Sequence, residues 1–249
     1  MKPVYLLSFI LLFASCDYIK SSEETTTEKS KKKKEKVSDG VKKNYHKGKL
    51  ASTVTYKDGL KNGSATNYYP DGKVNMEFNY KNGVKDGPYK WFFENGKVYI
   101  EGQYKENEKH GIFKTYRDNG SLLAEMPWHE GMACTGLKEY FESGNRKPVP
   151  KLVVKHKNTV RLNGQYKLEI SLSDKSAGKF YEGYLNDNNS FPDYFSDLNT
   201  SKSKGELVYF LNRGDFMMKK ITIIAKIKTR EKNFYILTKK INLSVENRF

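Results

Sequence analysis

The sequence predicts an all-β protein in which a repetitive antiparallel meander precedes a second β domain, and three observations support this class. Between about residues 44 and 147, glycines recur every 24 residues, at Gly48, Gly72, Gly96, Gly120 and Gly144. Between these glycines, apolar and polar residues alternate with a period of two, as in strands that are buried on one face only. After residue 150 the 24-residue period stops, but short alternating segments continue.

Several residue types keep the same 24-residue step, which marks residues 44–147 as a structural repeat. Two series of aromatic residues share the step of the glycines: Tyr56, Tyr80, Tyr104 and Trp128, and Tyr68, Phe92, Tyr116 and Tyr140. Each unit contains two strands. One of them is shown well by Val74, Met76, Phe78 and Tyr80, which alternate with polar residues.

The dipeptides between these strands predict where the hairpins turn. Asp71-Gly72, Asn95-Gly96 and Asn119-Gly120 are typical of two-residue type I′ turns, in which both positions have a positive φ. Longer glycine-containing connections, such as residues 82–87, are expected to join one hairpin to the next.

A two-residue turn at Asn95-Gly96 predicts a register that can be checked. It gives five cross-strand pairs: Glu94 with Lys97, Phe93 with Val98, Phe92 with Tyr99, Trp91 with Ile100, and Lys90 with Glu101. Moving this register by one repeat in either direction gives two more pairs, Lys114 with Glu125 and Thr66 with Glu77. Lys–Glu pairs and apolar pairs then lie on opposite faces, and a slip of one residue would mix them.

The repeats resemble a known family. Units such as Gly72-Lys73…Tyr80-Lys81-Asn82-Gly83…Asp86-Gly87…Trp91-Phe92-Phe93-Glu94-Asn95-Gly96 are similar to the bacterial variant of the MORN repeat, often labelled YwqK-type antitoxin. The resemblance covers about four copies and is best in the second and third. It implies a curved β-meander that mediates binding, and it implies no catalytic residues. The antitoxin label would place the protein in the cytosol, whereas the amino terminus predicts export.

One row of side chains on the polar face is a candidate binding surface. This row alternates cations and aromatic rings on neighbouring hairpins: Lys90, Phe92, Tyr99, Lys114, Tyr116, Lys138 and Tyr140. Exposed rings in a row suit a protein partner, an acyl chain or a glycan. The alternative is that the rings cover the sheet or pack beneath other parts of the chain.

Residues 1–15 are predicted to be a lipoprotein signal peptide. Lys2 precedes an apolar run from Val4 to Phe13, and small residues then lead to Cys16. This order is typical of a secretory signal, and the run is too short to span a bilayer. Cys16 resembles the lipobox cysteine, which is lipidated and begins the mature chain. We therefore expect an exported lipoprotein anchored in the membrane through Cys16, on the periplasmic face or the cell surface. A cleaved soluble signal is the alternative.

Residues 16–43 contain mainly Ser, Thr, Glu and Lys, so they are predicted to form a disordered tether. The formal net charge of the chain is +16, and most of the excess lies in the last hundred residues. A basic balance suits acidic partners, including anionic headgroups, although a well-solvated lysine-rich surface would have the same composition. Because export is predicted, no nucleic-acid partner is expected.

Pro148-Val149-Pro150 marks the boundary of a second domain, residues 151–249. Seven strands are expected there: Lys151–Lys157, Thr159–Leu162, Gln165–Ser173, Lys179–Leu185, Glu206–Asn212, Lys219–Thr229 and Asn233–Val245. A long polar loop is expected over residues 186–205. Seven short strands in about 100 residues predict an immunoglobulin-like sandwich. Because the Cys…Trp…Cys pattern is absent, a small barrel or a half-open sheet remains an alternative.

Sequence motifs for catalysis or metal binding are absent. The chain lacks a Walker lysine motif, a paired-cysteine metal site, His-Glu-x-x-His and Gly-x-Ser-x-Gly. Apart from Cys16 the only cysteine is Cys134, so no internal disulfide is expected. We therefore expect neither cofactor nor metal, although distant residues could still converge on an enzyme site between the domains.

The expected function is that of a non-enzymatic envelope lipoprotein whose repeat sheet binds a protein or an envelope component. The alternatives are a lipid- or glycan-binding module at the membrane surface and a toxin-neutralising protein of the antitoxin type. The sequence does not indicate an oligomeric state.

Overall fold

The computed structural model describes residues 38–192 and 197–248, and these are nearly all β-structure. The predicted signal peptide, Cys16 and residues 16–37 of the predicted tether lie outside the described residues. The described residues all belong to one compact unit, which contains both the repeats and the second domain. Among them, no helix is long and apolar enough to cross a membrane.

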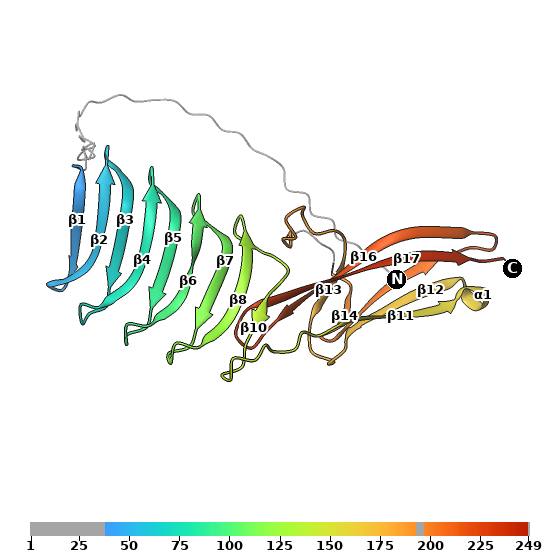
Figure 1. Ribbon diagram of the computed structural model, residues 1–249. Helices are drawn as coiled ribbons and strands as arrows, with labels where there is room; N and C mark the ends of the chain where they lie inside the picture. Colours follow the sequence, from blue (N-terminus) through green and yellow to red (C-terminus); the bar gives the residue numbers. More distant parts are fainter. Residues whose placement is uncertain (1–37, 193–196, 249) are drawn as a thin grey trace, which may run out of the picture. The chain divides into compact units, whose positions relative to one another are not determined.

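The repeats form one antiparallel sheet in which strands β1 to β8 and then β10 lie side by side in chain order, with β9 paired to β8 (Figure 1). We call it the repeat sheet. β1 begins inside the stretch that the sequence assigned to the tether. The strands are β1 Gly40–His46, β2 Lys49–Lys57, β3 Leu60–Tyr68, β4 Val74–Lys81, β5 Val84–Phe92, β6 Val98–Lys105, β7 Glu108–Tyr116, β8 Leu122–His129, β9 Met132–Ala133 and β10 Lys138–Glu139.

The turn types are the reverse of those predicted. At Asn95-Gly96, the Gly96 amide donates to the Phe93 carbonyl (2.9 Å) and the Phe93 amide donates to the Lys97 carbonyl (2.8 Å), so the loop has three residues. Gly96 has a φ of 82°, whereas Asn95 is not in the left-handed region. The role of Asn95 is instead to accept a hydrogen bond from the Lys97 amide through Oδ1 (3.0 Å). This is the three-residue hairpin that combines a type I turn with a glycine bulge.

The two-residue turns lie at the other end of the strands. Asn82 and Gly83 both have positive φ (50° and 88°), and Lys81 pairs directly with Val84. Four further turns of this kind occur among the described residues of the repeats, at Lys47-Gly48, Asp58-Gly59, Glu106-Asn107 and Glu130-Gly131. The predicted long connections are therefore tight turns, and a register shift follows those that join β2 to β3, β4 to β5 and β6 to β7.

The interior register is confirmed, but the pairing next to the bulged turn is wrong. Lys90 pairs with Glu101 and Trp91 with Ile100, and the predicted pairs of the neighbouring repeats, Lys114–Glu125 and Thr66–Glu77, also form. The three predicted pairs nearest the turn, Glu94–Lys97, Phe93–Val98 and Phe92–Tyr99, do not form. Phe92 pairs with Val98 because the register shifts between Trp91 and Phe92, and the Phe93 amide bonds to the Lys97 carbonyl. The glycine bulge takes up one residue there and leaves Tyr99 without a partner in the ladder.

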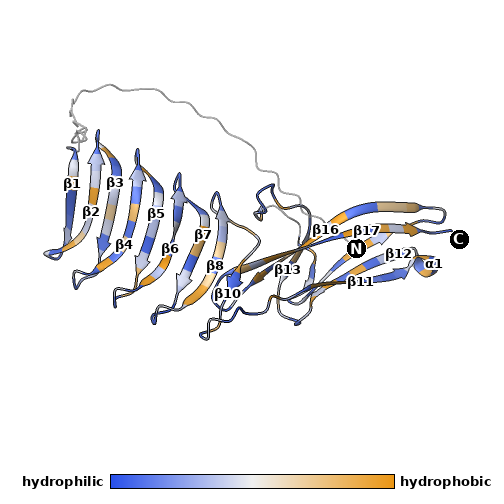
Figure 2. Cartoon of the chain, in the orientation of Figure 1, coloured by the Kyte–Doolittle hydropathy of each residue, from blue (hydrophilic) through white to orange (hydrophobic). Residues whose placement is uncertain are grey.

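The two faces of the repeat sheet differ in chemistry. The polar face carries the cross-strand row Glu77, Lys90, Glu101, Lys114 and Glu125. The aromatic face carries rings that pack edge to face or tilted, 5.3–6.2 Å apart, at Tyr89, Tyr104 and Phe113. Figure 2 shows the resulting mixture of apolar and polar residues along each strand.

Close packing on the aromatic face requires a glycine at one strand position. The ring of Phe113 lies directly on Gly102, where an added Cβ would meet ring carbons at 2.7 Å. Phe113 is itself buried, with 4% of its surface exposed, so its ring has little room to move. The rings of the aromatic face thus bury one another and part of the sheet backbone.

Lysines on the turns link one repeat to the next. The ammonium groups of Lys49, Lys73 and Lys97, each 24 residues apart, donate to backbone carbonyls of the following turn: Pro70 (2.8 Å), Glu94 (2.9 Å) and Asn119 (3.0 Å). These charge-assisted bonds satisfy turn carbonyls that no strand can reach.

The second domain is a sandwich of two sheets with the strand order β11-β12-β15-β14 in one and β13-β16-β17 in the other. This is the seven-strand order of the immunoglobulin constant-type fold, so the predicted fold class is confirmed. The strands are β11 Leu152–Thr159, β12 Gln165–Leu172, β13 Lys179–Glu182, β14 Asn199–Ser201, β15 Lys204–Phe210, β16 Phe216–Lys228 and β17 Phe234–Glu246.

The expected number of seven strands is correct only because two errors cancel. Thr159–Leu162 was predicted to be a strand, but the chain forms the single helical turn α1 (Val160–Asn163), which ends at Gly164 in the left-handed region (φ 73°). Conversely, β14 lies inside the predicted polar loop. Asn199 of β14 donates to the Gly178 carbonyl (2.7 Å) and accepts from the Phe180 amide (2.7 Å), which ties this short polar strand to β13.

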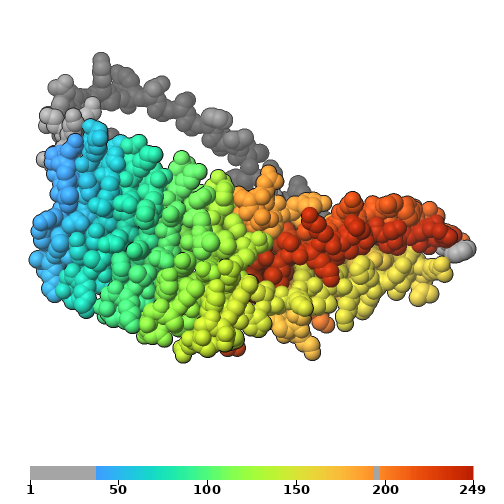
Figure 3. All heavy atoms as spheres, viewed as in Figure 1, coloured from blue at the N-terminus to red at the C-terminus, as the bar shows by residue number. Residues whose placement is uncertain are grey.

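The sandwich core extends into the last repeat. Ala124 and Met126 of β8 and Leu137 before β10 belong to the same buried cluster as Leu168, Ile170 and Ile223 of the sandwich. Figure 3 shows the side chains of the last repeat against those of the sandwich. The carboxylate of Glu139, 4% exposed, accepts hydrogen bonds from Thr229 Oγ1 (2.6 Å) and Asn233 Nδ2 (2.9 Å). The sandwich therefore covers the carboxyl-terminal end of the repeat sheet.

Candidate polar binding site on the repeat sheet

Along the polar face, two of the three glutamates of the cross-strand row, Glu101 and Glu125, belong to a local network that repeats with the sequence. Glu125 Oε2 accepts hydrogen bonds from Lys138 Nζ (3.0 Å) and from the Tyr140 hydroxyl (2.9 Å). These bonds, that of Lys138 first, hold the pKa of the Glu125 carboxyl below its usual value.

One repeat earlier, Glu101 has equivalent partners. Its Oε1 accepts a hydrogen bond from the Tyr116 hydroxyl (2.6 Å), and Lys114 Nζ lies 3.7 Å away. Burial raises the pKa of the Tyr116 hydroxyl to about 12, and the bond to Glu101 adds to the shift. In both repeats, a lysine from the next hairpin neutralises one glutamate and a tyrosine from that same hairpin donates a hydrogen bond to it.

The network stops at Glu77. The residues that correspond to its tyrosine and lysine partners are Phe92, which has no hydroxyl group, and Lys90. Glu77 and Lys90 are exposed, and among the described residues neither has a hydrogen bond or ion pair within bonding distance. One tyrosine-to-phenylalanine change in the repeat thus leaves a carboxylate and an ammonium group open to a ligand.

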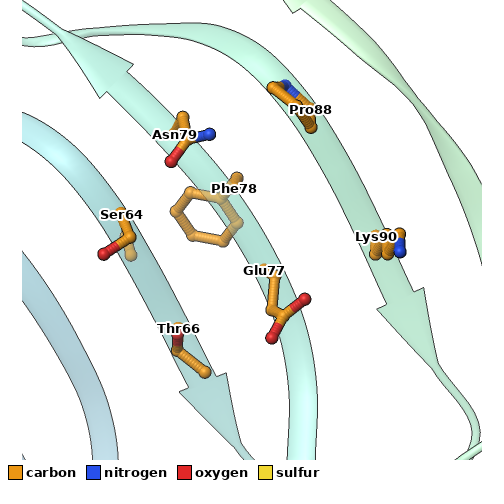
Figure 4. Close-up of a pocket in the computed structure, with 8 residues that line it drawn as sticks. Ser64, Thr66, Glu77, Phe78, Asn79, Pro88 and Lys90 are labelled. Carbon is orange, nitrogen blue, oxygen red and sulfur yellow. The ribbon is translucent and has the colours of Figure 1, made fainter.

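A hollow of about 270 Å³ lies at this place, between β3, β4 and β5. Figure 4 shows Ser64, Thr66, Glu77, Asn79 and Lys90 projecting from the three strands around it, together with Pro88. The lining offers a carboxylate, an ammonium group, an amide and two hydroxyl groups. These groups can exchange hydrogen bonds with a polar ligand, such as a peptide or a sugar, whereas the hollow has no histidine or cysteine.

The structure places six of the seven predicted binding residues on the polar face, in three different situations. Lys90 lines the hollow. Lys114, Tyr116, Lys138 and Tyr140 are already engaged with Glu101 and Glu125. Phe92 lies half-buried on the polar face beside the bulged turn.

Tyr99 is not on the polar face. Its ring packs against Trp91 (5.0 Å between centroids) and Phe93 (4.7 Å), which places it on the aromatic face. Because the bulge leaves Tyr99 out of the ladder, the alternation used to place it does not hold there. The predicted continuous row of cations and aromatic rings is therefore interrupted.

The Tyr116–Glu101 contact predicts a dependence of stability on alkaline pH. A raised tyrosine pKa means that the folded chain holds the proton more tightly than the unfolded chain, so this stabilisation is complete below about pH 10 and is lost as the pH rises from about 10 to about 12. Over this interval, the free energy of unfolding should fall more steeply in the wild type than in Tyr116→Phe, as measured by urea unfolding at several pH values. Parallel curves for the two proteins would contradict the contact.

Among the described residues, the other potentially reactive groups do not assemble into a cluster of three metal-ligating side chains. Cys134 is 6% exposed, and burial raises the pKa of its thiol, as expected of a packed side chain. The rings of His110 and His129 lie 5.1 Å apart, but over residues 38–192 and 197–248 no three metal-ligating side chains come together.

A second periodic row, on the aromatic face, was missed by the sequence interpretation. Lys61, Lys85 and Lys109 lie 24 residues apart, and each ammonium group is placed over a ring of the following strand: Tyr80 (5.0 Å), Tyr104 (5.4 Å) and Trp128 (4.4 Å). The same step that revealed the glycines would have revealed these lysines.

Comparison with known protein families identifies the repeats. Three consecutive segments, residues 61–82, 85–106 and 109–130, match the family described as MORN repeat variant. Each segment covers one pair of strands, from β3–β4 to β7–β8. No curated protein matches the chain significantly.

Proposed function

Because three consecutive segments of the chain are MORN repeats of the variant type, we propose that the protein is a non-enzymatic binding scaffold of the cell envelope. In this proposal the repeat sheet holds a protein or another envelope component at its polar face. The chain is exported and anchored through a lipidated Cys16, and residues 17–37 connect the anchor to the sheet. The toxin-neutralising role that often labels this type of repeat would require the cytosol, so it remains the less favoured candidate.

The observation that carries this proposal is the gap in the polar network at Glu77. In the later repeats, the carboxylates of the polar face already have partners within the protein. A lysine and a tyrosine hydroxyl contact each of Glu101 and Glu125. At Glu77 and Lys90 the same face presents unpaired opposite charges beside a hollow. Charged groups without internal partners are those that a ligand can engage without first breaking a contact within the protein.

The Glu77–Lys90 hollow can be tested by capture from envelope extract. Wild-type protein should retain a partner in a stoichiometric amount, and Glu77→Ala/Lys90→Ala should retain at least about tenfold less, because charged contacts at an interface contribute most of its specificity. Lys105→Ala/Glu142→Ala is the matched control, since it also removes one exposed cation and one exposed anion but lies outside the hollow. Equal recovery by wild type and both variants would reject the hollow as the binding site.

The proposed anchor is tested separately by cell fractionation. Full-length wild type should be found in the membrane fraction and should take up labelled fatty acid, whereas Cys16→Ser should lose the label and move largely to the soluble fraction. Even one acyl chain binds membranes only marginally, and Cys16→Ser has no acyl chain at this position. The shift to the soluble fraction should therefore be nearly complete. Membrane recovery of Cys16→Ser equal to that of the wild type would contradict lipid anchoring.

A further inference from the structure

The aromatic face carries a row of half-buried cations that the binding of a partner at the polar face does not use. Lys61, Lys85 and Lys109 lie on β3, β5 and β7, and each pairs across the strand with a tyrosine of the same series: Tyr56, Tyr80 and Tyr104. The backbone carbonyl of each lysine accepts a hydrogen bond from the turn of the next repeat, from Gly83 (2.8 Å), Asn107 (2.9 Å) and Gly131 (3.1 Å). The row therefore has the same backbone geometry in all three repeats.

The three ammonium groups lie on aromatic rings and are not neutralised. Lys85 also lies 5.2 Å from the Phe78 ring centroid, and Lys109 lies 5.0 Å from that of Phe113. Within the described part of the chain, no carboxylate lies within 4 Å of any of the three. This differs from the polar face, where glutamates neutralise Lys114 and Lys138.

The spacing of the row is set by the sheet. Successive lysines are two strands apart, and strands in a sheet lie roughly 4.8 Å apart, so the charges recur about every 9.6 Å. That interval is close to the length of two sugar rings in an extended β-linked polysaccharide. Between the charges, the half-buried Tyr80 and Tyr104 rings offer apolar surface that a sugar can contact beside the lysine placed over each ring.

We propose that the aromatic face of the repeat sheet binds a linear acidic polysaccharide that carries one carboxylate on every second sugar. Each carboxylate pairs with one lysine of the row, and the sugars between them lie on the tyrosine rings. This site is on the opposite face from the Glu77–Lys90 hollow, because Phe78 and Tyr89 alternate with Glu77 and Lys90 along β4 and β5. The inference is therefore independent of the polar-face partner.

Other polyanions match the row less well. Duplex nucleic acid carries about one charge per 1.7 Å, which is several times denser than the lysines. An anionic bilayer presents charges in two dimensions and has no reason to select a single row. A polysaccharide with a carboxylate on every second sugar combines the matching interval with a surface for ring stacking.

The test uses residues 36–249, which form one compact unit and lack both the apolar signal segment and the Lys31–Lys34 run that would bind any polyanion. The probe is hyaluronan, whose carboxylates lie on every second sugar, measured by isothermal titration at low salt. The test variant is Lys61→Gln/Lys85→Gln/Lys109→Gln. Glutamine keeps most of the side-chain stem over the ring, and an unchanged melting temperature shows that the sheet is intact.

The chain contains a matched control row. Lys57, Lys81 and Lys105 have the same 24-residue step, are exposed and lie at the ends of β2, β4 and β6. Replacing all three by glutamine removes the same charge with the same period. We expect the test variant to bind hyaluronan at least about tenfold more weakly than the wild type, and the control variant to change by less than about twofold.

Oligosaccharide length tests the spacing itself. A hexasaccharide with three carboxylates should bind the wild type several-fold more tightly than a tetrasaccharide with two, and this step should disappear in the test variant. Equal losses in the test and control variants would overturn the proposal, because they would show binding by net charge alone. Tighter binding to phosphatidylglycerol vesicles or to polyphosphate than to hyaluronan would also overturn it, in favour of a membrane or a phosphate polymer. Loss of capture by Glu77→Ala/Lys90→Ala with unchanged hyaluronan binding would separate the two faces.

Discussion

Phe180→Ala is expected to lower the free energy of unfolding by about 3–5 kcal/mol, the range for removing a fully buried phenylalanine ring. Phe180 of β13 is 0% exposed. Its ring lies against Gly205 of β15, where an added Cβ would meet Phe180 at 3.1 Å. Because Gly205 has no side chain, the opposite sheet has nothing at this position that could fill the cavity left by the ring. In antibody domains the equivalent strand carries a buried tryptophan against a disulfide. Here one phenylalanine and aliphatic neighbours fill this place.

Phe210→Ala is the matched control for Phe180→Ala. Phe210 ends β15 and is 73% exposed, so its truncation should change the stability by less than about 0.5 kcal/mol. Urea unfolding followed by far-ultraviolet circular dichroism measures both variants. Losses of similar size in the two variants would contradict the assignment of Phe180 to the centre of the sandwich core.

Glu139→Ala is expected to produce the second largest loss, because it removes one buried polar link between the repeat sheet and the sandwich. Its carboxylate accepts hydrogen bonds from Thr229 and Asn233 of the β16–β17 turn, and Lys147 lies 3.8 Å away. A buried donor that loses its acceptor costs about 1–3 kcal/mol. Thr229 and Asn233 are half-buried, so each should cost an amount near the lower end of this range, for a total loss of roughly 2 kcal/mol. Lys147 keeps Glu231 as a partner at 3.2 Å and adds little to the loss.

Hydrogen exchange locates the effect of Glu139→Ala. Amides of the β16–β17 turn and of β10 should exchange faster in the variant, while those of β3 to β5 should not change. Glu139→Gln, which keeps one acceptor oxygen, should fall between wild type and Glu139→Ala. Glu130→Ala removes a carboxylate that is 63% exposed and serves as the control. A stability change below about 0.5 kcal/mol in Glu139→Ala would show that the Glu139 hydrogen bonds do not contribute measurably to the junction of the sheet and the sandwich.

The register of the repeat sheet could be predicted because its two faces have different chemistry. In the register that pairs Lys90 with Glu101, Trp91 pairs with Ile100 on the other face. Shifting one strand by one residue would have moved charged side chains onto the apolar face. The turns could not be assigned in the same way. An Asn-Gly dipeptide fits both a two-residue turn and a three-residue turn with a bulge, and the chain uses it in both, at Asn82-Gly83 and Asn95-Gly96. The choice depends on which flanking residues pair, so it is a property of the whole hairpin.

The candidate site was predicted only in part for the same reason. Lys90 was placed correctly because it lies in the regular part of β5, whereas Tyr99 was assigned to the wrong face because it lies in a bulge. The importance of Glu77 depends on a missing hydroxyl group at Phe92. A sequence comparison between repeats contains this information, but only the Tyr116–Glu101 and Tyr140–Glu125 bonds show what the hydroxyl group does.

By itself, the sequence determined the all-β class, the 24-residue repeat, the pairing inside each hairpin and the separation of a polar face from an apolar one. These properties follow from local alternation and from a period that repeats several times. The tertiary structure alone decided the order of the sandwich strands, the contact of Glu139 with the β16–β17 turn and the placement of Lys61, Lys85 and Lys109 over rings of the following strands. Each of these joins residues from different segments, and their positions depend on bulges, twist and packing that no single stretch of sequence specifies.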